Sequence, residues 1–147
     1  MGRTADMKNI LFVCSYNACR SQMAEGLARA LADGEFEIRS AGINAGGVNS
    51  DAIASMRESG IDISRHTSDR LTPAHYDWAD YVVTVCDAAK ESCPVVPNGK
   101  RTLHWSIPDP YGAYTSTEEK NNSFSRVREM LREKVAGLLE SIRRGEA

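Results

Sequence analysis

The sequence predicts an α/β fold, a three-layer sandwich in which helices cover both faces of a four-stranded parallel sheet. The main observation is that strand-like apolar runs alternate with segments of helical periodicity, which is typical of parallel strands joined by right-handed crossovers. A second is the length of 147 residues, which suits one domain that buries roughly 70% of its unfolded surface. With no internal repeat or linker in the sequence, we expect a single domain over residues 7–147, preceded by an N-terminal extension, 1–6.

The first strand is predicted over residues 10–13, ILFV. A continuous apolar run of this kind is typical of a strand that is covered on both faces. Apolar residues then recur at helical spacing from Met23 to Leu31, and Gly34 follows as a helix stop. Residues 36–40 alternate in polarity, which predicts the second strand, with its end at Ala41 and Gly42.

The middle of the chain predicts two helices and a strand. Asn49 begins a group of capping residues, and Gly60 is well placed to end the helix that follows. Thr72 is a cap with proline behind it at the first helical position, which predicts a short helix. The apolar run over residues 81–85 then predicts the third strand.

The last third predicts one strand, one polar loop and one long helix. Pro94, Pro97 and Gly99 interrupt the chain, so we place the fourth strand over residues 100–104. From Phe124 to Ile142 apolar residues step by three or four positions, which indicates an amphipathic helix. The sequence between, DPYGAYTSTEEKNNS, is predicted to be a long polar loop.

Charge and hydropathy exclude two classes of partner. Lys and Arg number 18 against 20 Asp and Glu, a net charge of −2, so there is no basic field to hold a nucleic-acid backbone. No apolar run approaches the roughly 20 residues that span a bilayer. We therefore expect a cytoplasmic monomer, in which the four cysteines serve metal binding, catalysis, redox chemistry or simple packing.

The stretch VCSYNACRSQ connects the first strand to the first helix, where ligands of such folds bind. Its backbone N–H groups and the positive helix end form a nest for a tetrahedral oxyanion, and Arg20 adds a fork of donors. Cys14 lies in this positive field, which favours the nucleophilic thiolate, and Ser21 can donate a hydrogen bond to it. The alternative is a small buried thiol followed by a surface arginine. Cys19 is interpreted as a packed thiol without a chemical role.

A nucleophile of this kind needs an acid that protonates the departing oxygen. Asp109 is the candidate, because Pro108 and Pro110 restrict the backbone on both sides and hold it extended. The alternative is an ordinary turn aspartate, which Asp-Pro often is.

The other cysteines and the histidines leave alternatives open. Cys86 follows the third strand and Cys93 precedes a proline, so either is explained as a packed or loop thiol. A metal site of Cys86, Cys93 and His104 lacks the close cysteine pair typical of such sites. His66 and His75 have no ligand-like spacing.

The sequences CSYNACRS and DPY resemble those of the low-molecular-weight tyrosine phosphatase fold, over essentially the whole chain from residue 7. Within that fold, CSYNACRSQMAEG, VTVCDAAKESCP and HW are similar to the thioredoxin-coupled arsenate reductases. Four cysteines fall into register: Cys14, Cys19, Cys86 and Cys93. The resemblance implies the strand order 2-1-3-4. Tyr16 departs from it, since such loops more often carry glycine there, and its side chain would narrow the anion pocket.

The resemblance also implies a mechanism without an organic cofactor. Cys14 attacks arsenate, and Asp109 protonates the leaving oxygen. Cys86 then attacks Cys14 and releases arsenite, and Cys93 moves the disulfide to Cys86–Cys93, where thioredoxin reduces it. The oxyanion would be held by amides and side chains of Ser15, Tyr16, Asn17, Ala18, Cys19 and Arg20.

In the implied strand order, Cys14 and Cys86 follow neighbouring strands about 4.8 Å apart, within disulfide range. Residues 87–92 favour helix, which would separate Cys86 from Cys93 by about 10 Å along the axis, whereas a disulfide tolerates less than about 7 Å between α-carbons. We therefore expect residues 86–93 to unwind on oxidation.

Members of the resembled family can hold a potassium ion beside the anion site, and the matching positions here are Asn17, Glu25, Ser40 and Asp69. All four carry oxygen, as a hard cation requires. The alternative is that Asn17 braces the loop, Glu25 faces water, and Ser40 and Asp69 end their elements. Two other functions stay open: a phosphatase that hydrolyses phosphate monoesters with Cys14, Arg20 and Asp109, and a noncatalytic oxyanion-binding or thiol-sensing module.

Overall fold

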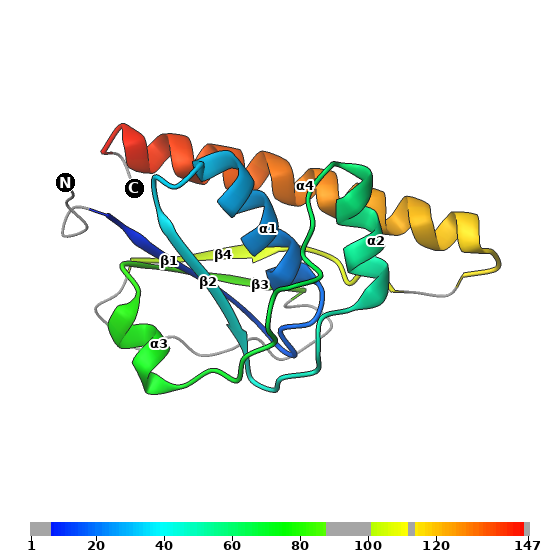
Figure 1. Ribbon diagram of the computed structural model, residues 1–147, viewed down its shortest axis with the longest axis horizontal. Helices are drawn as coiled ribbons and strands as arrows, with labels where there is room; N and C mark the ends of the chain where they lie inside the picture. Colours follow the sequence, from blue (N-terminus) through cyan, green and yellow to red (C-terminus); the bar gives the residue numbers. More distant parts are fainter. Residues whose placement is uncertain (1–6, 88–100, 112–113, 146–147) are drawn as a thin grey trace.

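Four parallel strands form one sheet in the order β2-β1-β3-β4, as the sequence and its resemblance predict (Figure 1). The structure is a computed structural model and describes residues 7–87, 101–111 and 114–145. The elements are β1 (Asn9–Cys14), α1 (Arg20–Ala32), β2 (Glu37–Gly42), α2 (Ser50–Glu58), α3 (Pro73–Trp78), β3 (Tyr81–Cys86), β4 (Arg101–Ser106) and α4 (Thr117–Arg143).

Helices cover both faces of the sheet, which confirms the three-layer sandwich. Alternate residues of β1 point to opposite faces, so Phe12 packs in the larger core, with α1, α2 and α4, while Leu11 packs in the smaller one. Trp78 of α3 packs against the smaller core. Figure 1 shows α3 on the opposite side of the sheet from α1 and α4.

Most predicted element ends agree with the structure, because they rest on local backbone chemistry. The side chain of Asn49 caps α2 by accepting a hydrogen bond from Ala52 N at 2.9 Å. Gly34 and Gly60, the two predicted stops, both have positive φ. Pro73 is the first residue of α3. The predicted second strand also agrees, since β2 ends at Gly42.

The predicted start of the last helix is wrong, because α4 begins at Thr117 rather than near Phe124. Ser116 caps it by accepting from Glu119 N at 3.1 Å, and the Glu119 carboxylate accepts from Thr115 N at 3.0 Å. Ser116 thus satisfies one N–H group of the first turn, and Glu119 holds the residue that precedes the cap. This cap converts the second half of the predicted polar loop into helix.

In the parts of the chain that the structure describes, no helix is both long enough and apolar enough to span a membrane. The predicted helix over 87–92 extends beyond these parts, and Cys93 lies outside them. Since all four strands are parallel, the connections that leave β1 and β4 meet at the carboxyl edge of the sheet.

Candidate active site

The loop between β1 and α1 is held from outside through its carbonyl groups. Residues 43–49, which we call the flanking segment, run alongside it. Their backbone N–H groups donate to the carbonyl oxygens of Cys14, Ser15, Tyr16 and Ala18 at 2.8–3.2 Å. The carbonyl side of the loop is therefore fixed, and on its other side Asn17 N donates to the Cys14 sulfur, in the manner of an anion-binding nest.

Asn17 braces the loop internally. It is fully buried and has a left-handed backbone (φ 49°), which asparagine tolerates better than most residues. Its Oδ1 accepts from Asp69 N at 2.7 Å, and its Nδ2 donates to Ser21 Oγ and Ser40 Oγ, both at 2.9 Å. A side chain at Gly42 would come within 2.5 Å of Asn17 N, so the loop requires glycine beneath it.

Cys14 lies at the floor of this loop, only 4% exposed. Its Sγ lies 2.8 Å from Ser21 Oγ, and Asn17 N donates to it at 3.1 Å. Cys14 is a free thiol. Two hydrogen-bonding groups thus converge on the sulfur that would attack a bound oxyanion.

Arg20 is the first residue of α1, and its side chain is turned toward the connection that follows β4. Its guanidinium donates to Ile107 O at 2.9 Å, and the residue is only 8% exposed. Asp109 is two residues further along the same connection. Arg20, a permanently charged side chain, is therefore hydrogen-bonded to the segment that carries the candidate acid.

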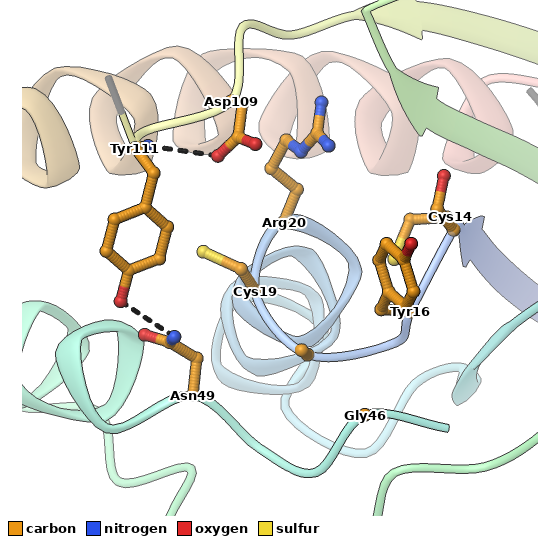
Figure 2. A pocket seen from close by; sticks show the side chains of 10 residues that line it. Cys14, Tyr16, Cys19, Arg20, Gly46, Asn49, Asp109 and Tyr111 are labelled. Carbon is orange, nitrogen blue, oxygen red and sulfur yellow. Dashed lines mark hydrogen bonds between the residues drawn. The ribbon is translucent and has the colours of Figure 1, made fainter. Parts of the chain in front are cut away.

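The predicted nucleophile, arginine and acid meet in one pocket of about 320 Å³. Figure 2 shows Asp109 and Arg20 on one side of it and Cys14 and Tyr16 on the other. The pocket is lined by Cys14, Ser15, Tyr16, Ala18, Cys19, Arg20, Gly46, Asn49, Asp109 and Tyr111. The loop, α1, the flanking segment and the β4–α4 connection thus each contribute to it.

Cys19 lies in the pocket wall with properties unlike those of Cys14. Burial strongly raises the pKa of the Cys19 thiol, so this sulfur stays protonated at neutral pH. Its Sγ lies 4.0 Å from Met23 Sδ. This environment agrees with the interpretation of Cys19 as a packed thiol.

Cys86 is fully buried at the end of β3 and takes part in a disulfide, whereas Cys14 and Cys19 are free. Because Val13 pairs with Thr84, Cys86 lies one position beyond the point opposite Cys14. Strand spacing and rise then place the two α-carbons about 6 Å apart, which a disulfide can bridge.

The positions considered for potassium are hydrogen-bonded to one another, Asn17, Ser40 and Glu25 through their side chains and Asp69 through its backbone. Ser40 Oγ donates to Glu25 Oε1 at 2.5 Å and accepts from Asn17. The Glu25 carboxylate is also paired with Arg29 at 2.8 Å. Asp69 joins the cluster through its backbone, while its carboxylate accepts from Thr67.

Each of these side chains already has a hydrogen-bond partner, and Arg29 pairs with the charge of Glu25. Their oxygens are the ligand type of a hard cation, which would compete with Arg29 for the Glu25 carboxylate. Potassium binding stays a prediction, and no step of the chemistry below uses it. Among the described residues, no group of three or more His, Cys, Asp or Glu side chains could hold a metal ion.

Sequence reasoning gave no role to Tyr111 or Gly46, and it treated Asn49 only as a helix cap, yet all three line the pocket. The DPY sequence was a signal for Tyr111, because it places an aromatic residue two positions after the acid. Gly46 and Asn49 gave no such signal, since their place beside the loop depends on hydrogen bonds between distant parts of the chain.

Residues 9–147 match the family described as low molecular weight phosphotyrosine protein phosphatase. This match covers nearly the whole chain, and the chain belongs to that family. The stretches CSYNACRS and DPY, which carry part of the resemblance, supply the cysteine, arginine and aspartate of the pocket.

Within the family, the chain is similar to proteins named arsenate reductase. It is 43% identical to the arsenate reductase of Bacillus licheniformis over 91% of this chain and 96% of that protein. It is 35% identical to a solved arsenate reductase in the phosphate binding state, with a TM-score of 0.78 over 92% of this chain and 99% of the other. It is 27% identical to the thioredoxin-dependent arsenate reductase of Corynebacterium glutamicum, with a TM-score of 0.75 over 97% and 65% of the two chains.

Proposed function

We propose that this protein reduces arsenate to arsenite and takes its electrons from thioredoxin through three of its cysteines. The observation that carries the proposal is the pairing of two different sulfurs at neighbouring strand ends. Cys14 is a free thiol in an anion pocket, and Cys86 is a disulfide-forming cysteine on the adjacent strand.

In the first step the Cys14 thiolate attacks the arsenic of arsenate. A sulfur–arsenic bond forms, one arsenic–oxygen bond breaks, and Asp109 gives its proton to the departing oxygen, which leaves as water. Arg20 and the loop amides hold the other oxygens, whose charge they match. No electron has yet been transferred.

In the second step the Cys86 thiolate attacks Cys14 Sγ. A disulfide forms, and the electron pair of the sulfur–arsenic bond passes to arsenic, which leaves as arsenite. Cys93 then attacks Cys86, forming Cys86–Cys93 and releasing the Cys14 thiolate. The dithiol of thioredoxin reduces that disulfide, and so supplies the two electrons that arsenic gained.

The alternation of β3 sets a requirement on the second step. Cys14 contacts Ser21 on the α1 side of the sheet. Cys86 lies four residues after Val82 in the same strand and so shares its face, and Val82 packs in the smaller core on the other side. The α-carbons are close enough for a disulfide, but the two side chains leave the sheet in opposite directions. Attack on Cys14 therefore requires local rearrangement at the end of β3.

A phosphatase that hydrolyses phosphate monoesters is the second candidate, and the family membership favours it. It would use Cys14, Arg20 and Asp109 with water in place of Cys86. The disulfide at Cys86 favours the reductase, because a hydrolase has no use for a redox-active cysteine behind its nucleophile. A noncatalytic oxyanion-binding module uses neither Asp109 nor Cys86.

The test is NADPH oxidation by the purified protein with thioredoxin and thioredoxin reductase. We expect oxidation that depends on arsenate and is lost in Cys14→Ser, Cys86→Ser and Cys93→Ser. Cys19→Ser is the matched control and should retain activity, since this thiol is held protonated. The phosphatase would be established instead if the unaltered protein showed no arsenate-dependent NADPH oxidation and if phosphate-ester hydrolysis survived in Cys86→Ser and Cys93→Ser. If Cys14→Ser altered neither activity, the binding module would be favoured.

The proposed donor also bears on the cellular setting. A relay that ends on thioredoxin requires a compartment in which thioredoxin is kept reduced, as it is in the cytoplasm. We therefore propose a cytoplasmic enzyme that acts in arsenic detoxification.

A further inference from the structure

The candidate acid Asp109 lies on a short connection that is fixed at several points. Arg20 donates to Ile107 O at 2.9 Å on one side of Asp109, and Ser123 Oγ donates to Pro110 O at 2.7 Å on the other. Tyr111 N donates to Asp109 Oδ1 at 2.9 Å. The last contact acts directly on the carboxylate, so the position of Tyr111 determines where that carboxylate is held.

The side chain of Tyr111 is anchored to two helices. Its hydroxyl donates to Asp51 Oδ2 at 2.5 Å and accepts from Asn49 Nδ2 at 2.8 Å, both at the start of α2. Its ring packs edge-on against Phe124 of α4, with 5.0 Å between centroids. Lys120 of α4 also pairs with Asp51 at 3.1 Å. Figure 2 shows Tyr111 between Asp109 and Asn49, bonded to both.

Burial and the hydrogen bond to Asp51 raise the pKa of Tyr111 to about 12. The phenol therefore remains a donor throughout the neutral range. In return, that hydrogen bond lowers the pKa of Asp51, so the acceptor stays ionised. A neutral donor to a carboxylate is among the stronger hydrogen bonds in proteins.

We infer that Tyr111 is a positioning residue for the reaction: its hydrogen bonds to Asp51 and Asn49 hold the backbone amide that aims the Asp109 carboxyl group into the pocket. This inference rests on the proposed function, since it assigns Tyr111 a role only through the acid. Protonation of the leaving oxygen requires a carboxyl group within hydrogen-bond reach. Small displacements of such a group lower the rate without altering how tightly the anion binds.

The experiment is a double-mutant cycle of Tyr111→Phe and Asp109→Asn in the full chain, measured by arsenate-dependent NADPH oxidation. Tyr111→Phe keeps the ring and its contact with Phe124 but removes the hydroxyl. We expect it to lower kcat about tenfold with the KM for arsenate unchanged within about twofold, whereas Asp109→Asn lowers kcat about 100-fold. In the Asp109→Asn background, Tyr111→Phe should have no further effect, because its contribution passes through Asp109.

Two further variants complete the design. Tyr114→Phe is the matched control, since among the described residues the buried Tyr114 hydroxyl has no hydrogen-bond partner, and it should leave kcat unchanged. Asp51→Asn weakens the hydrogen bond between Tyr111 and Asp51 at its acceptor. It should therefore lower kcat, as Tyr111→Phe does. Circular dichroism and the melting temperature establish that each variant is folded.

The outcomes separate the positioning role of Tyr111 from the proposed function, in which Asp109 is the acid. If Asp109→Asn lowers kcat but Tyr111→Phe does not, or if the two losses multiply, the positioning role is wrong and the proposed function stands. If Asp109→Asn retains full activity, the acid role of Asp109 fails, and the inference fails with it. Loss of arsenate binding in Tyr111→Phe would likewise overturn the inference, since it would show direct contact with the substrate.

Discussion

At the residue scale, the two tyrosines that line the pocket are held in different ways. Tyr111 is fixed through its hydroxyl and ring, whereas the hydrogen bonds described for Tyr16 use its backbone carbonyl, and Tyr16 is 60% exposed. Gly46 lies beside Tyr16, since a Cβ at Gly46 would be in ordinary van der Waals contact with Tyr16 Cβ at 3.4 Å. The ring of Tyr16 therefore stands at the mouth of the pocket beside the nucleophile.

We predict that Tyr16→Ala widens the pocket toward organic anions. Arsenate reduction should be inhibited by phenylphosphonate and by inorganic phosphate, and the ratio of the two inhibition constants should shift toward phenylphosphonate by about tenfold, the effect of a few methylene groups of contact. Tyr16→Phe keeps the ring and should retain the original ratio. A ratio that is unchanged in Tyr16→Ala, or that shifts toward phosphate, would contradict this prediction.

Single residues also show how far sequence reasoning reaches at the site. Cys14, Arg20 and Asp109 could be placed in one pocket because parallel strands deliver their loops to one edge of the sheet. For Asn17 the sequence offered bracing of the loop only as an alternative to potassium binding, since the contacts that show it depend on a left-handed backbone and on bonds to Ser40 and Asp69. Such contacts join distant parts of the chain and leave no local pattern.

At the element scale, α4 shows why its predicted start was late. Apolar periodicity marks the helix only from Phe124, its first buried residue. The two turns before it are polar and are stabilised by the cap at Ser116 and by Glu118 and Glu119 near the positive helix end. The capping sequence STEE carries this information, but burial periodicity does not.

The end of β3 is the element on which the relay depends. Cys86 must first reach Cys14 and then bond to Cys93, and a helical path over 87–92 would leave about 10 Å between the latter two. We predict that amide protection of residues 86–93 is lower in the Cys86–Cys93 disulfide form than in the reduced form. Hydrogen exchange followed by mass spectrometry measures this, with α1 as an internal reference. Equal protection in both forms would count against the shuttle.

At the scale of the whole molecule, the anion loop is connected to the packing of the domain through Gln22 and His66. Gln22 Nε2 donates to Asn17 O at 3.0 Å and to Thr67 O at 2.8 Å, and His66 Nδ1 lies 3.0 Å from Gln22 Oε1. Burial lowers the pKa of His66 from its ordinary value of 6.5, against the opposing effect of Glu25. The folded protein thus favours neutral His66.

Global stability should therefore depend on pH in a defined direction. Above pH 6.5, the ordinary value, His66 is neutral in both states and contributes no pH dependence. As the pH falls below it, the unfolded chain takes up a proton more readily than the folded one, so the free energy of unfolding decreases until the folded-state pKa is passed. Urea titrations at pH 7.5 and 5.5 measure this decrease. In His66→Gln the fall in the free energy of unfolding between these two pH values should be smaller. A fall as large as in the unaltered protein would show that other groups cause it.

The strands and both layers of helices were predictable because apolar periodicity and turn residues recur along the whole chain, as in Phe12, Gly34 and Gly60. The order of the strands followed only from the resemblance. What the sequence left undetermined is how connections lie against one another. The contact between the β4–α4 connection and α2, made by Tyr111 and Asn49, joins residues far apart in the chain. Its existence depends on the finished fold.

The flanking segment, residues 43–49, has a consequence for altering this protein. The same short stretch holds the carbonyl side of the anion loop and ends at Asn49, which caps α2 and bonds to Tyr111. One insertion there would shift three supports at once. Anyone grafting a tag or a binding peptide should choose another surface turn, such as the one around Gly34, where a side chain would meet no neighbouring atom within 4 Å.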